Sequence, residues 1–328
     1  MSLTNDAADP VGSYLISPGG DTLGYGQNVN PITGVSSLSS TAYTHNPVPG
    51  IWTLIVDFAE PVVGNEISQP FTGNIRFNQV RASASGLPNS GSIHLPAGTS
   101  VTVPVTITNN GAAPEAFFID PRLNTTTILG LASLSSDTVN LPMPSTAFPP
   151  VWLVPTETSS VSVSQSSSLP AMFTFFVSIG DPDIASATTG SLCSTTAIVS
   201  FTPPGGTVTA GIWYAQPSEC GPYPGPAPTG AASIAMTAQS KAFDPAVTSD
   251  TGDFWPTSIN LATTFSPIIL NPGQTGTINV AITPSGASGT VVRGTLYVDD
   301  FATGTPTNYL YTESGDELAA FPYSYTIK

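Results

Sequence analysis

Positive charge is the scarcest property of this 328-residue sequence. Six lysines and arginines stand against 21 aspartates and glutamates, so the formal net charge is −15 at pH 7. An acidic surface repels phosphate groups, and no basic stripe is present that could release counterions from a nucleic acid or an anionic membrane. Binding to nucleic acids and adhesion to anionic membranes are therefore excluded as functions.

Long apolar runs are also missing. The densest apolar stretch, residues 171–177, is seven residues long, whereas a helix that spans a membrane needs about 18 residues. Insertion into a membrane is therefore not expected. The first residues, Met1-Ser2-Leu3, form neither the basic nor the apolar part of a signal peptide. A secreted protein with this start is expected to be a fragment of a longer one.

Cysteine is limited to Cys193 and Cys220. Their separation suits one disulfide that closes a loop, and such a bond stabilises a fold by about 3–4 kcal/mol. Two buried free thiols are the alternative. Scarce lysine together with abundant serine, threonine, glycine and proline is typical of secreted proteins, so an extracellular or cell-surface location is expected.

The residues that are abundant favour an all-β fold. Apolar residues make up 40% of the sequence, which is enough to form packed cores. The 33 prolines and 30 glycines interrupt every window in which a helical period could persist. β-branched residues instead alternate with polar ones at period two, which is the pattern of half-buried strands. The strands predicted in this way are residues 52–58, 101–107, 277–282, 294–298 and 323–327.

The sequence repeats two kinds of segment, A and B, at spacings of 161 to 175 residues. The A segment contains Gly-Ile-Trp, at residues 50–52 and again at 211–213. The B segment contains a turn, an alternating strand and a second turn, at residues 95–111 and again at 270–286. Long-period repeats indicate tandem domains, and units of this size bury their strands by packing two sheets as a sandwich. Chance similarity among strands rich in serine and threonine is the alternative.

The predicted order of these sandwiches is A-B-A-B. Their predicted bounds are residues 1–82, 83–148, 149–243 and 244–328. The second A unit begins with a strand at Trp152 that has no counterpart in the first, which begins almost at Ala8-Asp9-Pro10. The first A unit is therefore expected to be truncated, with its missing strands upstream.

Five stretches are the most distinctive in the sequence: residues 150–155, 180–183, 211–214, 289–299 and 321–326. They resemble the C-terminal extensions of secreted bacterial subtilisin-like serine proteases, which carry β-sandwich modules after the peptidase domain. The resemblance implies jelly-roll-like A units and immunoglobulin-like or fibronectin-like B units. It also implies that an upstream peptidase domain of the same polypeptide is the partner of this chain.

Catalytic motifs are absent from the sequence. A subtilisin-like site needs a serine nucleophile, a histidine base and an aspartate that orients the histidine. The two histidines, His45 and His94, lack the glycine-rich context of such a base, and no Gly-Thr-Ser-Met-Ala-like nucleophile turn is present. Asp250-Thr251-Gly252 is predicted to form a turn or linker, because no apolar strand precedes it and no second copy could share a proton with it.

Calcium is the one cofactor that we consider, because hard cations bind several oxygen ligands and this chain is rich in acidic loops. The candidate ligand pairs are Asp181 with Asp183, Asp299 with Asp300, and Asp250 with Asp253. None has the spacing of a recognised calcium loop, so solvated turns are the alternative.

The four tryptophans could form either cores or a flat binding platform. Trp52 and Trp213 occupy equivalent positions of the repeated Gly-Ile-Trp strands, which favours core positions. Trp255, which follows Asp253 and Phe254, is the residue expected to make a surface contact.

Three functions are compatible with these features. The leading prediction is a non-catalytic accessory region that stabilises, spaces or targets a subtilisin-like peptidase outside the cell. The second is an adhesion or carbohydrate-binding protein whose partner is an extracellular protein or polysaccharide. The third is a structural spacer of a cell-surface protein.

Overall fold

The structure, a computed structural model, is all-β, as predicted, and its strands fall into three regions. Among the described residues, no helix is long and apolar enough to cross a membrane. The structure describes residues 1–4, 11–20, 22–28, 36, 38, 40, 42, 49–58, 70–75, 80–111, 114–133, 136–141, 150–177, 193–202, 208, 210–220, 228–255, 265–301 and 314–328.

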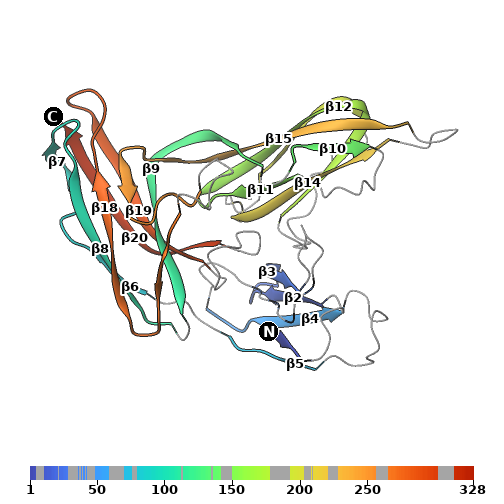
Figure 1. The fold of residues 1–328 in the computed structure, drawn as a ribbon, viewed down its shortest axis with the longest axis horizontal. Coiled ribbons are helices and arrows are strands. Elements are labelled where there is room, and N and C mark those ends of the chain that lie inside the picture. The colour runs from blue at the N-terminus through green and yellow to red at the C-terminus, as the bar shows by residue number, and fades with distance from the viewer. Residues whose placement is uncertain are drawn as a thin grey trace.

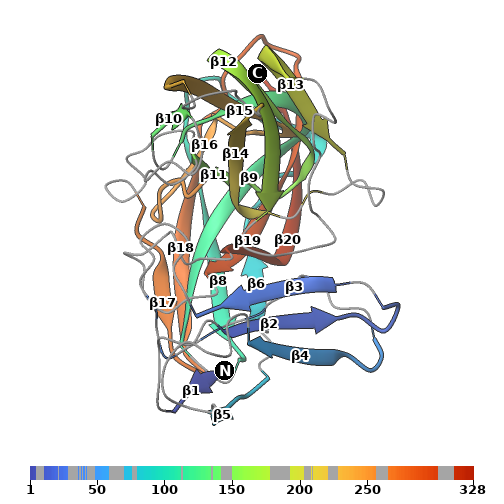
Figure 2. The ribbon, with the colours of Figure 1, turned by 90° about the vertical axis from the view of Figure 1, so that its right-hand side faces the viewer.

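The first region is the N-terminal region. Its strands are β1 (Ser2–Leu3), β2 (Val11–Ile16), β3 (Thr22–Gln27), β4 (Thr53–Phe58) and β5 (Phe71–Thr72). They form a three-stranded sheet in the order β3-β2-β4 and a separate pair, β1-β5. Figure 2 shows β4 at the outer edge of the three-stranded sheet.

The second region, which we call the split sandwich, is assembled from two distant stretches of the chain. Its strands are β6 (Val80–Ala84), β7 (Asn89–Leu95), β8 (Val101–Asn109), β9 (Glu115–Leu131), β16 (Val247–Ser249), β17 (Ile268–Leu270), β18 (Thr275–Ile282), β19 (Val291–Phe301) and β20 (Ser314–Ile327). The four-stranded sheet β16-β18-β8-β6 packs against the sheet that contains β9-β19-β20-β7.

Period-two alternation builds the core of the split sandwich. Val103, Val105 and Ile107 of β8 have no exposed surface, and the residues between them point away from the core. They pack with Ile278 and its neighbours on β18 and with side chains of the facing sheet. The buried residues of the facing sheet are Phe117, Ile119, Leu270, Leu296, Val298, Tyr323, Tyr325 and Ile327.

The prediction that residues 83–148 and 244–328 form separate sandwiches is wrong. Strands β8 and β18 pair with each other, with Val105 opposite Ile278, and β9 pairs with β19. A single B segment supplies only part of each sheet, so its alternating faces need the other copy to complete one core. The repeated turns before β8 and β18 are equivalent, since Gly98 and Gly273 both adopt the left-handed conformation, with φ of 73° and 77°.

The third region, the inserted unit, is formed by residues 131–243, between the two halves of the split sandwich. Its strands are β10 (Thr138–Leu141), β11 (Val151–Val154), β12 (Thr158–Val177), β13 (Ser194–Phe201), β14 (Gly211–Glu219) and β15 (Gly230–Phe243). The first half of β12 pairs with β13 and β15, and its second half pairs with β14. Trp152 and Trp213 lie side by side in its core, with 1% and 0% of their surface exposed.

The predicted boundaries at residues 82/83 and 148/149 also shift. Strand β6 starts at Val80 and belongs to the split sandwich, whereas β10 ends at Leu141 and belongs to the inserted unit. Strand β15 pairs with β9, so a single sheet runs from the inserted unit into the split sandwich (Figure 1). Hydrogen-bonded backbone therefore joins these two regions, whereas independent tandem domains would be connected by a flexible linker.

Candidate functional site

The candidate site is a set of buried and partly buried ionisable groups where the split sandwich meets the inserted unit. We call it the junction cluster, and its members are Asp120, Arg122, Glu157, Lys241, Tyr297, Asp299 and Glu317. Strand β9 creates it through alternation: Phe117 and Ile119 face the core of the split sandwich, whereas Asp120 and Arg122 face the inserted unit.

Arg122 is the centre of the junction cluster, and none of its surface is exposed. Its Nε donates to Asp120 Oδ1 at 2.6 Å, and its Nη1 donates to Ser240 Oγ at 3.2 Å and to Lys241 O at 3.1 Å. Its Nη2 approaches Thr156 Oγ1 at 3.4 Å, and Thr156 Oγ1 donates to Asp120 Oδ2 at 3.1 Å. One guanidinium therefore connects β9, β15 and the segment before β12.

A second ion pair lies beside the first. Lys241 Nζ donates to Glu157 Oε1 at 2.7 Å and to Tyr297 Oη at 3.1 Å, and Tyr297 Oη donates to Glu157 Oε1. Burial lowers the pKa of Lys241, but its bonds to Glu157 and Tyr297 outweigh this effect, so the net pKa is raised. Burial and the bond to Glu157 raise the pKa of Tyr297 to about 12.

Glu157 also has an unusual backbone. Its φ of 58° lies in the left-handed region, which costs a non-glycine residue about 1 kcal/mol or more. The backbone N–H of Lys241 and the hydroxyl of Ser240 both donate to Glu157 O, each at 3.1 Å. These bonds hold the strained residue where its carboxylate can reach Lys241 and Tyr297.

Two further acids are buried with little compensation. Asp299 of β19 lies opposite Glu317 of β20. Asp299 is fully buried, and among the described residues neither of its carboxylate oxygens has a hydrogen-bond partner; Glu317 Oε1 is also buried without one there. Burial, followed by the charges of Asp120 and Glu317, raises the pKa of Asp299 well above its usual range. Burial, Glu157 and Asp120 raise the pKa of Glu317 to about 8.

The junction cluster has the composition of a structural site. Besides the hydroxyl of Tyr297, the neighbouring Thr156 and Ser240 place hydroxyl groups on the Asp120–Arg122 pair, and among the described residues no imidazole lies near them. His94 is exposed on β7, and His45 lies outside the described residues. The groups present can hold two units together through buried polar contacts, but they do not form a nucleophile and base.

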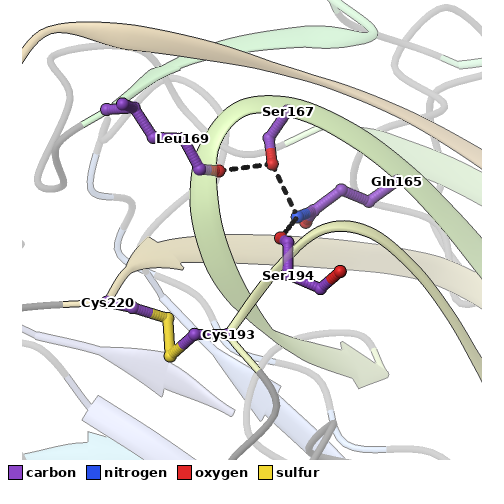
Figure 3. Close-up of a disulfide and its surroundings, with 6 residues drawn as sticks. All are labelled: Gln165, Ser167, Leu169, Cys193, Ser194 and Cys220. Carbon is purple, nitrogen blue, oxygen red and sulfur yellow. Dashed lines mark hydrogen bonds between the residues drawn. A yellow bond between two sulfur atoms is a disulfide. The ribbon is translucent and has the colours of Figure 1, made fainter.

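The predicted disulfide between Cys193 and Cys220 is present, with a Cα–Cα distance of 5.8 Å (Figure 3). It ties the start of β13 to the end of β14. Nearby, Gln165 Nε2 donates to Ser167 Oγ at 3.1 Å and to Ser194 O at 3.4 Å. The bond therefore closes one end of the inserted unit and lies outside the junction cluster.

The calcium prediction for Asp299 with Asp300 does not fit the structure. Both are buried on β19, where Asp299 pairs with Phe118 and Asp300 with Phe117 of β9, so their side chains leave opposite faces of the sheet. In the part of the chain that the structure describes, no three acidic, histidine or cysteine residues are grouped as metal ligands. Asp181 and Asp183 lie outside the described residues, and their calcium site stays a prediction.

Asp250 lies in the turn predicted for Asp250-Thr251-Gly252, where Gly252 has a φ of 66°. The carboxylate of Asp250 accepts hydrogen bonds from the backbone N–H of Asn279 at 3.1 Å and from the side-chain amide of Asn279 at 2.8 Å. Asp253 is exposed, and desolvation by the surrounding protein, followed by the charge of Asp120, raises its pKa. The carboxylates of Asp250 and Asp253 therefore interact with different neighbours.

The predicted surface role of Trp255 is also wrong. Only 4% of its surface is exposed, and it packs with Phe118, Phe254 and Phe265 beside the junction cluster. This aromatic group covers the face of β9 that points toward the inserted unit, so burial of apolar area draws Trp255 inward. Its indole Nε1 has no partner among the described residues.

Sequence reasoning missed Asp120 and Arg122. A usable signal was present: Asp120-Pro121-Arg122 directly follows the apolar Ala116–Ile119, and Arg122 is one of only six cationic side chains. A charge inside an apolar strand requires a buried partner. Tyr297, Asp299 and Glu317 gave no comparable signal, because their roles depend on pairing between distant strands.

Comparisons with known proteins establish no family for this chain. No family model matches it, and no curated protein matches it. Among solved structures, it is similar to the crystal structure of tripeptidyl peptidase 2, with 9% identity, 99% of this chain and 28% of that chain covered, and a TM-score of 0.23. The chain thus spans 28% of the length of that protein.

Two further solved structures match more weakly. A pore-forming protein shares 8% identity over 76% of this chain and 89% of that chain, with a TM-score of 0.09. Clostridium perfringens delta-toxin shares 10% identity over 76% and 87%, with a TM-score of 0.08. Scores this low carry no argument about function, so the proposals below depend on the residues of this chain.

Proposed function

We propose that the chain is a non-catalytic accessory segment of a secreted subtilisin-like serine protease, in which it acts as a rigid spacer beside the peptidase domain. The observation that carries this proposal is the junction between the two larger regions. Units joined by a linker move relative to one another by default. Here β9 and β15 share a ladder, and Arg122 is buried across it, so bending at this point would break paired backbone and expose a buried ion pair.

The identity of the parent protein depends on the sequence resemblance described above. Residues 150–155, 211–214 and 321–326, which carry part of that resemblance, form β11, part of β14 and part of β20. The Cys193–Cys220 disulfide supports an extracellular location, because such bonds persist in oxidising compartments. The chain is thus compatible with a longer protein that is a hydrolase and with its own role as the spacer of that protein.

The proposal is tested on the protein encoded by the complete gene. We expect an upstream domain with a serine, histidine and aspartate triad. Deletion of residues 1–328 should shorten the half-life of that peptidase on heating and leave kcat/KM on a short peptide substrate unchanged. A gene without a peptidase domain would overturn the proposal, as would a large loss of kcat/KM on the short peptide.

An adhesion or carbohydrate-binding function loses its main support, because the expected contact residue Trp255 is buried. A spacer of a cell-surface protein would use the same rigid junction. An anchor without a triad in the complete gene would favour it over the accessory role.

A further inference from the structure

Strand β4 presents an open and apolar edge. It pairs with β2 on one side, and no described strand pairs with its other side. Leu54 and Ile55 are 49% and 47% exposed, and Ile51, just before the strand, is 88% exposed. Successive residues of a strand point to opposite faces, so both faces of β4 meet solvent. Native proteins protect such edges with lysine, proline or a covering strand, and β4 contains neither residue.

The internal repeat identifies the equivalent of β4 elsewhere in the chain. Gly-Ile-Trp precedes Thr53 in the N-terminal region and Tyr214 in the inserted unit. Thr53 pairs with Ile16 of β2, and Tyr214 pairs with Phe176 of β12. The paired residues are 37 positions apart in the first case and 38 in the second. Strand β4 therefore corresponds to β14, and β2 to the second half of β12.

The two copies differ on their other edge. Strand β14 has a second neighbour, β11, whose four residues Val151–Val154 are all buried. In that register Trp152 lies opposite Trp213, and Trp213 has no exposed surface. Trp52, at the same position of the repeat, is only partly buried. Strand β11 pairs with residues 211–214, which correspond to residues 50–53, so the counterpart of the edge that β11 covers lies where β4 begins.

We propose that the free edge of β4 binds an antiparallel apolar strand of the β11 type, supplied by a segment of the longer polypeptide outside residues 1–328. The inference rests on the proposed function, because it requires that the chain is part of a longer protein. Such strand addition gains affinity from main-chain hydrogen bonds and specificity from alternate side chains. In the register of β11 on β14, Ile51 would contact the added strand, and the exposed Leu54 and Ile55 would lie next to its end.

A strand from the same polypeptide fits better than a second copy of the chain. Strand β11 has only four residues, and so short a strand pairs well when its connection to the sheet keeps its effective concentration high. Two copies of a chain with a net charge of −15 repel each other. The occupant is therefore a short, uncharged strand joined covalently to this chain.

Hydrogen exchange measured by mass spectrometry on the full-length protein and on residues 1–328 tests the inference. We expect the amides of residues 50–53, the counterpart of the stretch that β11 covers, to exchange at least about tenfold more slowly in the full-length protein. Strand β13, whose Ile198 is 75% exposed, is the reference and should exchange equally in both. Ile51→Lys should restore fast exchange at residues 50–53, whereas the matched control Ile198→Lys should not.

Each other outcome is decisive. Equal exchange of residues 50–53 in the two proteins would overturn the inference. Protection of this stretch in residues 1–328 alone that grows with protein concentration would assign the edge to a second copy and would also overturn it. If a full-length protein without a peptidase domain still protects this stretch, the strand inference stands while the accessory function fails, so the two results can be separated.

Discussion

The split sandwich and the inserted unit share one sheet but are stabilised by different means. The split sandwich brings together residues 167 positions apart, such as Thr108 and Thr275, and holds them through interlocked β-branched side chains without a disulfide. The inserted unit is a continuous stretch that packs around two tryptophans and closes one end with the Cys193–Cys220 bond. The difference shows that distant repeats need extensive complementary faces, whereas a continuous unit can rely on a cross-link.

Buried charge is concentrated where these two regions meet. Both cores are largely apolar, and an isolated ion within either would lack partners; the buried Asp244 beside the core of the split sandwich accepts a hydrogen bond from Tyr323. At the junction, Arg122 from β9 reaches Thr156, Ser240 and Lys241 of the inserted unit as well as Asp120. The charges therefore belong to both regions, and their removal should affect both.

The largest expected effect comes from Arg122→Ala. It leaves Asp120 buried without its cation, and breaking such a pair costs about 3–5 kcal/mol. Because Arg122 bonds to both regions, the calorimetric transitions of both should move to lower temperature. In the control, Asp120→Leu with Arg122→Leu, no buried charge is left over and most of the loss should be recovered. A shift confined to one region would contradict the role of Arg122 as the link.

The disulfide should separate the two regions. Cys193→Ala with Cys220→Ala opens a loop whose ends are 27 residues apart, and loss of such a cross-link costs about 3–4 kcal/mol. The inserted unit should unfold at a lower urea concentration, with a much smaller shift for the split sandwich. The measurement is urea unfolding followed by exchange at β13 and at β8. Equal destabilisation of both strands would mean that the two regions unfold as one.

Raising the pH should weaken the junction. The pKa of Glu317 is about 8 in the folded protein against an ordinary value of 4.5, so folding favours its protonated form. The stabilising contribution is complete below pH 4.5 and is lost as the pH rises through 8. Among its charged neighbours, Glu157 and Asp120 raise this pKa, and Arg122 and Lys241 lower it.

We therefore expect the melting temperature to fall between pH 5 and pH 8. The loss should be about 2 kcal/mol, because partial exposure of Glu317 reduces the full penalty. Glu317→Gln should flatten this dependence and raise the melting temperature at pH 8. A protein that is more stable at pH 8 than at pH 5, or a variant with the same slope, would show that other groups dominate.

Local patterns in the sequence were sufficient to predict five of the strands. Residues 101–107 and 277–282 were predicted from alternating valine and isoleucine, and they lie within β8 and β18. The all-β class followed from the density of proline and glycine, which is a local property. Alternation shows which side of a strand is buried, but it does not show which distant strand covers that side. The sharing of one core by the two B segments was therefore missed.

The same limit explains the candidate site. Asp299 and Asp300 have the local appearance of a solvated acidic turn, and only the register with β9 and β20 shows that both are buried. Trp255 follows Asp253 and precedes Pro256, a polar and turn-forming context that suggested exposure. Its burial depends on Phe118, which lies far before it in the sequence, and on Phe265, which lies ten residues after it.

The smallest expected effect comes from Trp255→Phe, which compares the aromatic packing at the junction with that in the inserted unit. Phenylalanine keeps contacts with Phe118 and Phe254, and it removes an indole N–H that lacks an acceptor among the described residues. Relief from an unsatisfied donor offsets part of the lost apolar area, so the free energy of unfolding should change by less than about 1 kcal/mol. Trp213→Phe, in the centre of the inserted unit, should cost more because it leaves a cavity opposite Trp152. Urea unfolding of both variants measures the difference in the free energy of unfolding. A larger cost at Trp255 than at Trp213 would mean that the indole nitrogen of Trp255 is hydrogen-bonded. The junction would then be more polar than its described contacts indicate.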